Sequence, residues 1–333
     1  MILQMLIFIV SLILVCVGAN LLVTGATKIA SAAGVSGLVI GLTVVSLGTS
    51  APELFISVIA SINGNPDLAL GNVLGSNMAN IGLVLALTAI VVPGTDGLAF
   101  RRPAVRRDFY VMGAITVLVG VFLVVGVFFF DSTVGMIPGG ILVLILCWYL
   151  FKVVSGAKKR QAGRLDSGSL EKEEEGLLVP RTVPGSWAFV ALGVGGLTYG
   201  SFLLRESVTY FAQVYGVSEL IIAWTMVSVG TSLPELATSI TAALRNAKGL
   251  AIGNIVGSNI FNMTLVLGAA SVASPIDVSP EVISLLGQYP ALLLLTAVLI
   301  VLGILNSRIS RQDGWILFIL YLAIMGGTLI TTA

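Results

Sequence analysis

Long hydrophobic stretches alternate with short polar ones along the whole chain. A helix needs about 20 consecutive apolar residues to cross the hydrocarbon core of a bilayer. The stretches that reach this length lie at residues 2–24, 36–62, 67–92, 108–130, 134–155, 185–204, 217–244, 249–273, 281–304 and 313–332. The pattern therefore predicts an all-α integral membrane protein with ten transmembrane helices.

The composition points to the same class of protein. Of the 333 residues, 57% are hydrophobic and only 10% are charged, whereas soluble domains carry about 25% charged residues. Histidine is absent, which removes a common transition-metal ligand and proton carrier. Cys16 and Cys147 lie far apart in apolar stretches, so we expect them to be small hydrophobic core residues.

The basic residues indicate the orientation of the chain in the membrane. If the N-terminus is outside, 16 of the 17 lysines and arginines fall in inward-facing segments, and only Arg205 lies outside. Cytoplasmic loops are enriched in Lys and Arg. We therefore expect a multi-pass protein of the cell membrane with both termini extracellular. The charged segment 156–184 is expected to be a cytoplasmic linker, because it is too short to form a domain.

The chain contains an internal repeat. Residues 36–93 align with residues 218–275 at a constant offset of 182, and 26 of the 58 positions are identical. This divides the chain into two five-helix halves, residues 1–155 and 185–333. Because five is odd, the second half should cross the membrane in the opposite sense. Inverted repeats of this kind are typical of secondary transporters, whose substrate sites lie near the membrane midplane.

Each repeat carries a glutamate beside a helix breaker in its first apolar stretch. Residues 48–53 read GTSAPE and residues 230–235 read GTSLPE. Thr49 and Glu53 are one helical turn apart and share a face. Pro52 has no N–H for the carbonyl of Gly48, so we expect helices 2 and 7 to be interrupted, with backbone carbonyls near Ser46–Gly48 released. The equivalent residues of the second motif are Ser228, Gly230, Thr231, Pro234 and Glu235.

The next apolar stretch of each repeat carries a polar stripe. Asn72, Ser76 and Asn80 are spaced four residues apart, and Asn254, Ser258 and Asn262 repeat the spacing. Together the stripes and the motifs supply carboxylate, hydroxyl and carbonyl oxygens without sulfur or imidazole, which suits a hard cation such as Ca²⁺ or Na⁺. Two other interpretations are open: the carboxyls could be protonated and structural, and the asparagines could join helices by hydrogen bonds.

These motifs carry a resemblance to a known family. GTSAPE with GNVLGSNMAN, and GTSLPE with GNIVGSNIFN, resemble the cation/Ca²⁺ exchanger superfamily, most of all the compact prokaryotic sodium/calcium exchangers. The resemblance covers nearly the whole chain. It implies that Glu53 and Glu235 bind Ca²⁺ or Na⁺ in turn, with Thr49 and Thr231 as further metal ligands. It also implies that further ion ligands are Ser76, Ser258, the backbone of Ser46 and Ser228, and the side chains of Asn80 and Asn262. Asn262 replaces an acid that accompanies potassium dependence in some relatives.

The expected function is a Na⁺/Ca²⁺ antiporter that works by alternating access, with the first and sixth helices sliding as a gate. A H⁺/Ca²⁺ antiporter of the same superfamily is the nearest alternative, and a Ca²⁺-selective channel is an alternative of another class. We expect no cofactor, no nucleic acid and no obligatory protein partner. The sequence contains no hydrolase or metalloprotease motif that would indicate an enzyme.

Overall fold

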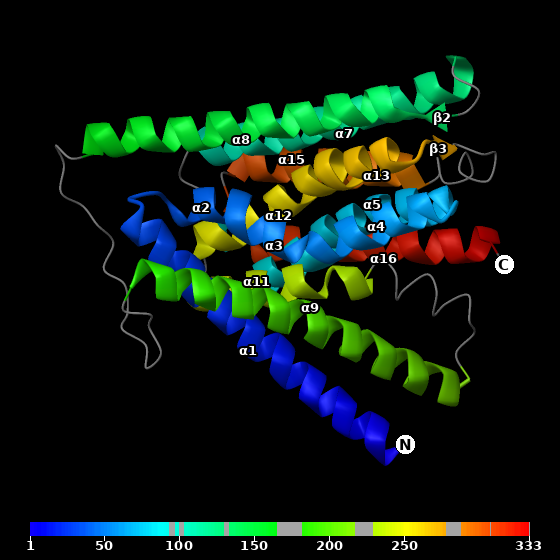
Figure 1. Ribbon diagram of the computed structural model, residues 1–333, viewed down its shortest axis with the longest axis horizontal. Helices are drawn as coiled ribbons and strands as arrows, with labels where there is room; N and C mark the ends of the chain where they lie inside the picture. The colour runs from blue at the N-terminus through cyan, green and yellow to red at the C-terminus, as the bar shows by residue number, and fades with distance from the viewer. Residues whose placement is uncertain are drawn as a thin grey trace.

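The computed structural model describes residues 1–92, 97–99, 103–129, 133–164, 182–216, 229–277, 288–306 and 308–332. Over these residues the protein is almost entirely helical (Figure 1). Among them, six helices are long and apolar enough to cross a membrane, or seven if the bent pair Gly37–Thr49 and Ala51–Ile62 forms one span. An all-α membrane protein is thus confirmed, whereas the count of ten spans remains a prediction.

The first half of the chain begins with one long helix, α1 (Ile2–Ala32). The next apolar stretch is divided into α2 (Gly37–Ile40), the π-helical turn η1 (Gly41–Val45), α3 (Ser46–Thr49) and α4 (Ala51–Ile62). The third consists of α5 (Pro66–Ala79), the π-helical turn η2 (Asn80–Leu85) and α6 (Ala86–Val91). Strand β1 (Leu98–Ala99), α7 (Pro103–Phe129), β2 (Thr133–Val134) and α8 (Met136–Arg164) complete this half.

The described elements of the second half follow the same order. It contains α9 (Val183–Val214), α11 (Leu233–Leu244), α12 (Lys248–Phe261), the π-helical turn η3 (Asn262–Val266), α13 (Leu267–Ala273), β3 (Ile276–Asp277), α15 (Gln288–Asn306), β4 (Arg308–Ile309) and α16 (Arg311–Thr332). The turns η2 and η3 begin at Asn80 and Asn262, which are equivalent positions of the repeat. π-Helical turns are frequent at functional sites.

Helix α8 extends into the segment that the sequence indicated as the linker. We expected it at 156–184, but α8 continues without a break to Arg164. Residues 156–164 read GAKKRQAGR, and the Ala, Lys, Arg and Gln in this segment favour a helix. The helix can therefore extend beyond its apolar part, and most of the expected linker, residues 165–181, lies outside the described residues.

Helices from the two halves are interleaved. In Figure 1, α1 and α9 run side by side along one edge of the molecule, while α7, α8 and α15 lie at the opposite edge. Between them, α4 packs on α13, and its counterpart α11 packs on α6. In the same way α8 packs on α13, and its counterpart α16 packs on α6. The strands also join the halves, because β1 pairs with β4 and β2 pairs with β3. The elements around the motifs are therefore held by both halves.

The contact between α1 and α9 is a close approach of two backbones. A Cβ atom added to Gly18 would lie 2.7 Å from the backbone nitrogen of Leu197, and one added to Gly193 would lie 2.5 Å from that of Leu22. Real Cβ atoms do not come this close to backbone atoms, so only glycine fits at either position. Small residues at helix interfaces are typical of membrane proteins.

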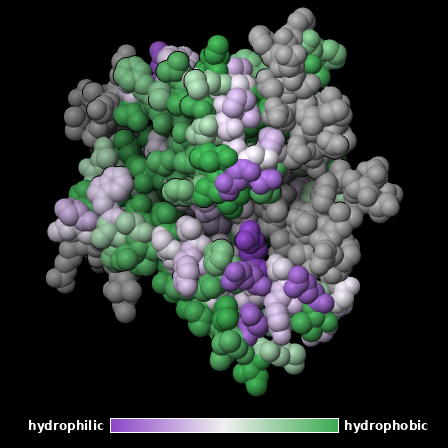
Figure 2. Space-filling model, turned by 45° about the vertical axis from the view of Figure 1, so that its right-hand side comes forward, coloured by the Kyte–Doolittle hydropathy of each residue, from purple (hydrophilic) through white to green (hydrophobic). Residues whose placement is uncertain are grey.

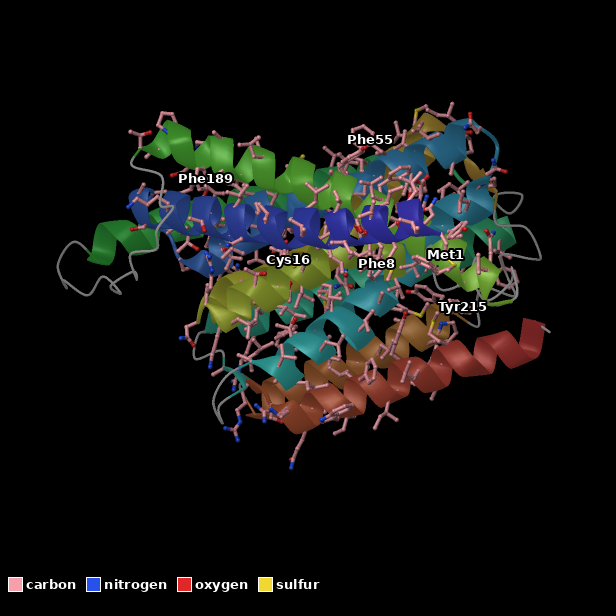
Figure 3. All side chains as sticks on the ribbon, turned by 90° about the horizontal axis from the view of Figure 1, so that it is seen from below. Met1, Phe8, Cys16, Phe55, Phe189 and Tyr215 are labelled. Carbon is pink, nitrogen blue, oxygen red and sulfur yellow. The ribbon has the colours of Figure 1, made fainter. Side chains whose placement is uncertain are left out.

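The outer surface is rich in apolar side chains, as expected for a protein in lipid. Hydrophobic residues cover much of the face shown in Figure 2. Phe55 of α4, labelled in Figure 3, is 65% exposed. The expectation that the two cysteines are core residues is wrong, because Cys16 and Cys147 are both exposed. They lie on long apolar helices with little of their surface buried, so the bilayer takes the place of a core around them.

Candidate ion-binding site

Each glutamate lies in the first turn of a helix that follows a break. At Ser50 the backbone leaves the helix (φ −86°, ψ 5°), and α4 begins at Ala51 with Pro52 in its first turn and a bend of 46°. Ser232 has nearly the same conformation (φ −84°, ψ 6°) before α11. The predicted interruptions are therefore present in both motifs. The positive end of each helix dipole faces Glu53 or Glu235 and favours a negative charge there.

The backbone near the first break differs from expectation in one detail. The carbonyl of Ser46 accepts from the backbone nitrogen of Ser50 at 3.0 Å and from Thr49 Oγ1 at 3.4 Å, so it is not released from the helix. The carbonyl of Gly48 is the one that Pro52 deprives of its usual donor, because proline has no N–H. Ser228, the predicted counterpart of Ser46, lies outside the described residues.

Both glutamate side chains are completely buried, and most of their oxygens lack a donor. Each residue is 0% exposed. Oε1 and Oε2 of Glu53 have no hydrogen-bond partner among the described residues, and neither does Oε2 of Glu235. Oε1 of Glu235 accepts from Ser50 Oγ at 3.2 Å and from Ser258 Oγ at 3.4 Å. No lysine or arginine of the described chain neutralises either carboxylate.

The two threonines contact the polar stripe of the opposite half. Thr49 Oγ1 donates to Asn254 Oδ1 at 3.0 Å and lies 3.3 Å from Ser258 Oγ. Thr231 Oγ1 lies 3.0 Å from Ser76 Oγ. All of these side chains are at most 5% exposed. The hydroxyls predicted to be ligands are thus brought together across the boundary between the halves.

Asn80 and Asn262 are also buried in the region where the halves meet. Both are 0% exposed, and none of their four side-chain polar atoms has a partner among the described residues. The alternative that they join helices by hydrogen bonds therefore has no bond to support it in this part of the chain. Both residues begin a π-helical turn, η2 or η3.

A second set of asparagines supports the glutamate-bearing helices. Asn72 Nδ2 donates to Ser57 Oγ at 2.9 Å and to the backbone oxygen of Glu53 at 3.3 Å. Asn254 Nδ2 makes the same bonds in the second half, to Ser239 Oγ at 3.0 Å and to the backbone oxygen of Glu235 at 3.5 Å. The internal repeat is therefore visible in individual hydrogen bonds.

Asn77 and Asn259 occupy equivalent positions of the repeat and contact each other. Asn77 Nδ2 donates to the backbone oxygen of Asn259 at 3.3 Å, which favours a structural role for this pair. Sequence reasoning also missed a residue of the site, Ser50, which crosses the halves to Glu235. A signal was available, because Ser50 lies inside GTSAPE and is repeated as Ser232.

The arrangement can coordinate a hard cation but is poorly suited to a resident transition metal. Among the described residues no three His, Cys, Asp or Glu side chains come together. The donors are two carboxylates with hydroxyl and amide oxygens around them, which is the chemistry that Ca²⁺ and Na⁺ prefer. Several of these oxygens are buried and unpaired, so a cation would satisfy groups that the protein leaves without donors.

Comparison with known proteins gives a family. The sodium/calcium exchanger protein family matches residues 3–154 and 185–329. Inner membrane protein YrbG of Escherichia coli (strain K12) is 35% identical over 316 residues, which cover 94% of this chain and 92% of that protein. Sodium/calcium exchanger MaX1 of Methanosarcina acetivorans is 30% identical over 345 residues, covering 96% of this chain and 97% of that protein.

A solved structure has the same fold. The sodium-calcium exchanger NCX_Mj, soaked with 2.5 mM Na⁺ and 0.1 mM Ca²⁺, superposes with a TM-score of 0.77 at 29% sequence identity, covering 98% of each chain. The family match and the relatives span both halves of the chain and include both glutamate motifs. The chain therefore belongs to the sodium/calcium exchanger protein family, whose members are transporters and not enzymes.

Proposed function

We propose that this protein is a secondary active antiporter that exchanges Na⁺ for Ca²⁺ across the cell membrane by alternating access. The observation that carries the proposal is the pair of buried glutamates with unpaired oxygens, one in each half. An ionised carboxylate without a partner at the bilayer centre costs at least about 2.5–3.5 kcal/mol. A cation that passes through the site removes this cost each time it binds.

The proposed ligands are those that the sequence indicated. Glu53 and Glu235 hold the ions at the centre, and Thr49, Thr231, Ser76 and Ser258 add hydroxyl oxygens. Asn80 and Asn262 line the middle of the site, and the backbone oxygens of Ser46 and Ser228 complete the proposed set. Two glutamates balance one Ca²⁺ or two Na⁺, so Ca²⁺ and Na⁺ compete for overlapping oxygens and loaded states are favoured.

The topology belongs to the same proposal. Ten spans in two inverted halves would place both termini outside and the linker inside, in agreement with the distribution of Lys and Arg. The last helix of each half packs on an equivalent helix of the other half, α8 on α13 and α16 on α6, which supports two related halves. At Gly18 and Gly193 the backbones of α1 and α9 meet directly, with no side chain of either glycine between them, which supports sliding of this pair as the gate.

Uptake of ⁴⁵Ca²⁺ into vesicles that contain the purified protein tests the driving ion. Na⁺-loaded vesicles diluted into Na⁺-free buffer should accumulate Ca²⁺, and uptake should not require K⁺, because Asn262 replaces the acid that accompanies potassium dependence in relatives. Uptake driven by a pH gradient alone would instead identify a H⁺/Ca²⁺ antiporter. Single-channel currents in planar bilayers would identify a channel and overturn the proposal.

A further inference from the structure

The orientation of the Asn254 side-chain amide can be deduced from its partners. Its nitrogen faces the backbone oxygen of Glu235 at 3.5 Å and Ser239 Oγ at 3.0 Å. A backbone carbonyl can only accept a hydrogen bond, so the NH₂ group must be on this side. Oδ1 consequently faces Thr49 Oγ1, 3.0 Å away. Since Oδ1 can only accept, the Thr49 hydroxyl must be the donor, and Asn254 Oδ1 at 3.0 Å is a closer acceptor for its single hydrogen than the backbone oxygen of Ser46 at 3.4 Å.

This bond decides what the Thr49 hydroxyl can offer to an ion. A threonine hydroxyl has one hydrogen and two lone pairs. With its hydrogen committed to Asn254, the oxygen presents lone pairs to its other neighbours, which include Ser258 Oγ at 3.3 Å. A cation binds to lone pairs and is repelled by a hydroxyl hydrogen that points at it. Asn254 thus prepares the Thr49 oxygen as a ligand without touching the ion itself.

The first half has the same residues but lacks the equivalent bond. Asn72 is anchored to Ser57 and to the backbone of Glu53 just as Asn254 is anchored in the second half. Its Oδ1, however, is buried with no partner among the described residues. Thr231, the counterpart of Thr49, lies 3.0 Å from Ser76 Oγ, just as Thr49 lies 3.3 Å from Ser258 Oγ. Of these two asparagines, Asn254 binds a threonine hydroxyl through Oδ1 and Asn72 does not, as far as the described residues show.

We propose that Asn254 is a positioning residue for cation binding, acting through the chain Ser239–Asn254–Thr49 that links one half of the protein to the other. The proposal rests on the proposed function, since it assumes that Thr49 is an ion ligand. The Ser239 hydroxyl anchors the Asn254 amide, the amide holds the Thr49 hydrogen, and the Thr49 oxygen is left to face the cation.

A double-mutant cycle on Ca²⁺ affinity tests the chain. Ca²⁺ binding to the purified full-length protein would be measured by calorimetry for Thr49→Val, Asn254→Leu and the double variant. Each single substitution should weaken binding by roughly tenfold, the size expected for loss of one hydrogen-bonded ligand. The double variant should also be weaker by only about tenfold, because both changes remove the same contribution. If the two substitutions acted independently, the double variant would bind Ca²⁺ about a hundredfold more weakly, and this result would overturn the proposal.

Controls separate positioning from general destabilisation. Thr49→Ser keeps the hydroxyl and should bind Ca²⁺ nearly as the unmodified protein does. Asn72 makes no bond to Thr49, so the loss of Ca²⁺ affinity in Asn72→Leu should multiply with the loss in Thr49→Val. The melting temperature of the ion-free variants reports any structural damage, whereas non-additivity in the affinity is not produced by two unrelated structural defects.

The serine anchors provide a milder matched pair if Asn254→Leu does not fold. Ser239→Ala should weaken Ca²⁺ binding about threefold, because the Asn254 amide loses an anchor. Ser57→Ala should leave affinity unchanged, since Asn72 holds no threonine. Equal effects of the two variants would overturn the proposal. An unmodified protein that neither binds nor exchanges Ca²⁺ would instead overturn the proposed function.

Discussion

Glu53 and Glu235 are equivalent in the repeat but differ in their surroundings. Glu235 accepts from two serine hydroxyls, whereas neither oxygen of Glu53 has a donor among the described residues. An isolated buried carboxylate is destabilising unless it is paired or bound to a cation. The stability of the ion-free protein should therefore be more sensitive to charge at Glu53 than at Glu235.

Replacing either glutamate with glutamine should abolish exchange, because the site loses one of its two negative charges. Glu53→Gln and Glu235→Gln should each reduce Na⁺-driven ⁴⁵Ca²⁺ uptake to background, while Ser57→Ala should change it little. Exchange at the unmodified rate in either glutamate variant would show that the ions bind elsewhere.

Thermal unfolding tests the role of the Glu53 carboxylate. Glu53→Gln should raise the melting temperature of the ion-free protein, because a neutral side chain replaces a carboxylate without donors. It should also remove the increase in melting temperature that Ca²⁺ is expected to give the unmodified protein, since ligand binding stabilises the folded state. A Ca²⁺-induced increase that persists in Glu53→Gln would contradict the role of this carboxylate.

At the same scale, the sequence indicated the types of residue in the site better than their partners. The duplication singled out the glutamates, threonines, serines and asparagines, because a residue kept in both copies is visible within one chain. Each threonine contacts the serine of the opposite half, but the sequence could not predict that Asn254 Oδ1 also binds Thr49 while Asn72 Oδ1 has no partner among the described residues. Identical motifs carry no information about a difference between the halves, which arises from the packing of the whole molecule.

Among the elements, the packing of α1 against α9 gives a prediction with an internal control. Gly193→Ala should destabilise the protein by about 1–3 kcal/mol through overpacking, because its new Cβ would lie 2.5 Å from the backbone of Leu22. It should also slow exchange if the two helices slide. Gly195→Ala adds a methyl group with nothing within 4 Å and should be neutral in both respects.

Thermal unfolding in detergent and initial rates of ⁴⁵Ca²⁺ uptake would measure both effects. Slow uptake by Gly195→Ala, or normal stability and uptake in Gly193→Ala, would contradict the close contact of α1 with α9. The comparison is matched because both substitutions lie on the same helix, two residues apart, and add the same group.

Local chemistry accounts for the elements that could be foreseen. Proline within an apolar stretch predicted the breaks before α4 and α11, since proline always removes a backbone donor. The π-helical turns and the extension of α8 to Arg164 were not predicted. A π-helical turn depends on neighbouring helices more than on residue type, and the apolar pattern marks where a span leaves the lipid rather than where its helix ends.

For the whole molecule, the distribution of basic residues predicts a testable orientation. In a variant with Cys16 and Cys147 replaced by alanine, Ala333→Cys should react with a membrane-impermeant maleimide in right-side-out vesicles. Ser169→Cys, within the linker, should react only after the membrane is permeabilised. The opposite result would reverse the topology and contradict the positive-inside assignment.

The paired strands have a mechanical consequence for the molecule. Through β1 with β4 and β2 with β3, the segments that connect the later helices of each half are tied to the other half at two places. Among the described elements, α1 and α9 take part in neither tie. The later helices of the two halves are thus tied to each other by hydrogen bonds. In the proposed exchange cycle, α1 and α9 can shift relative to these helices without breaking either strand pair.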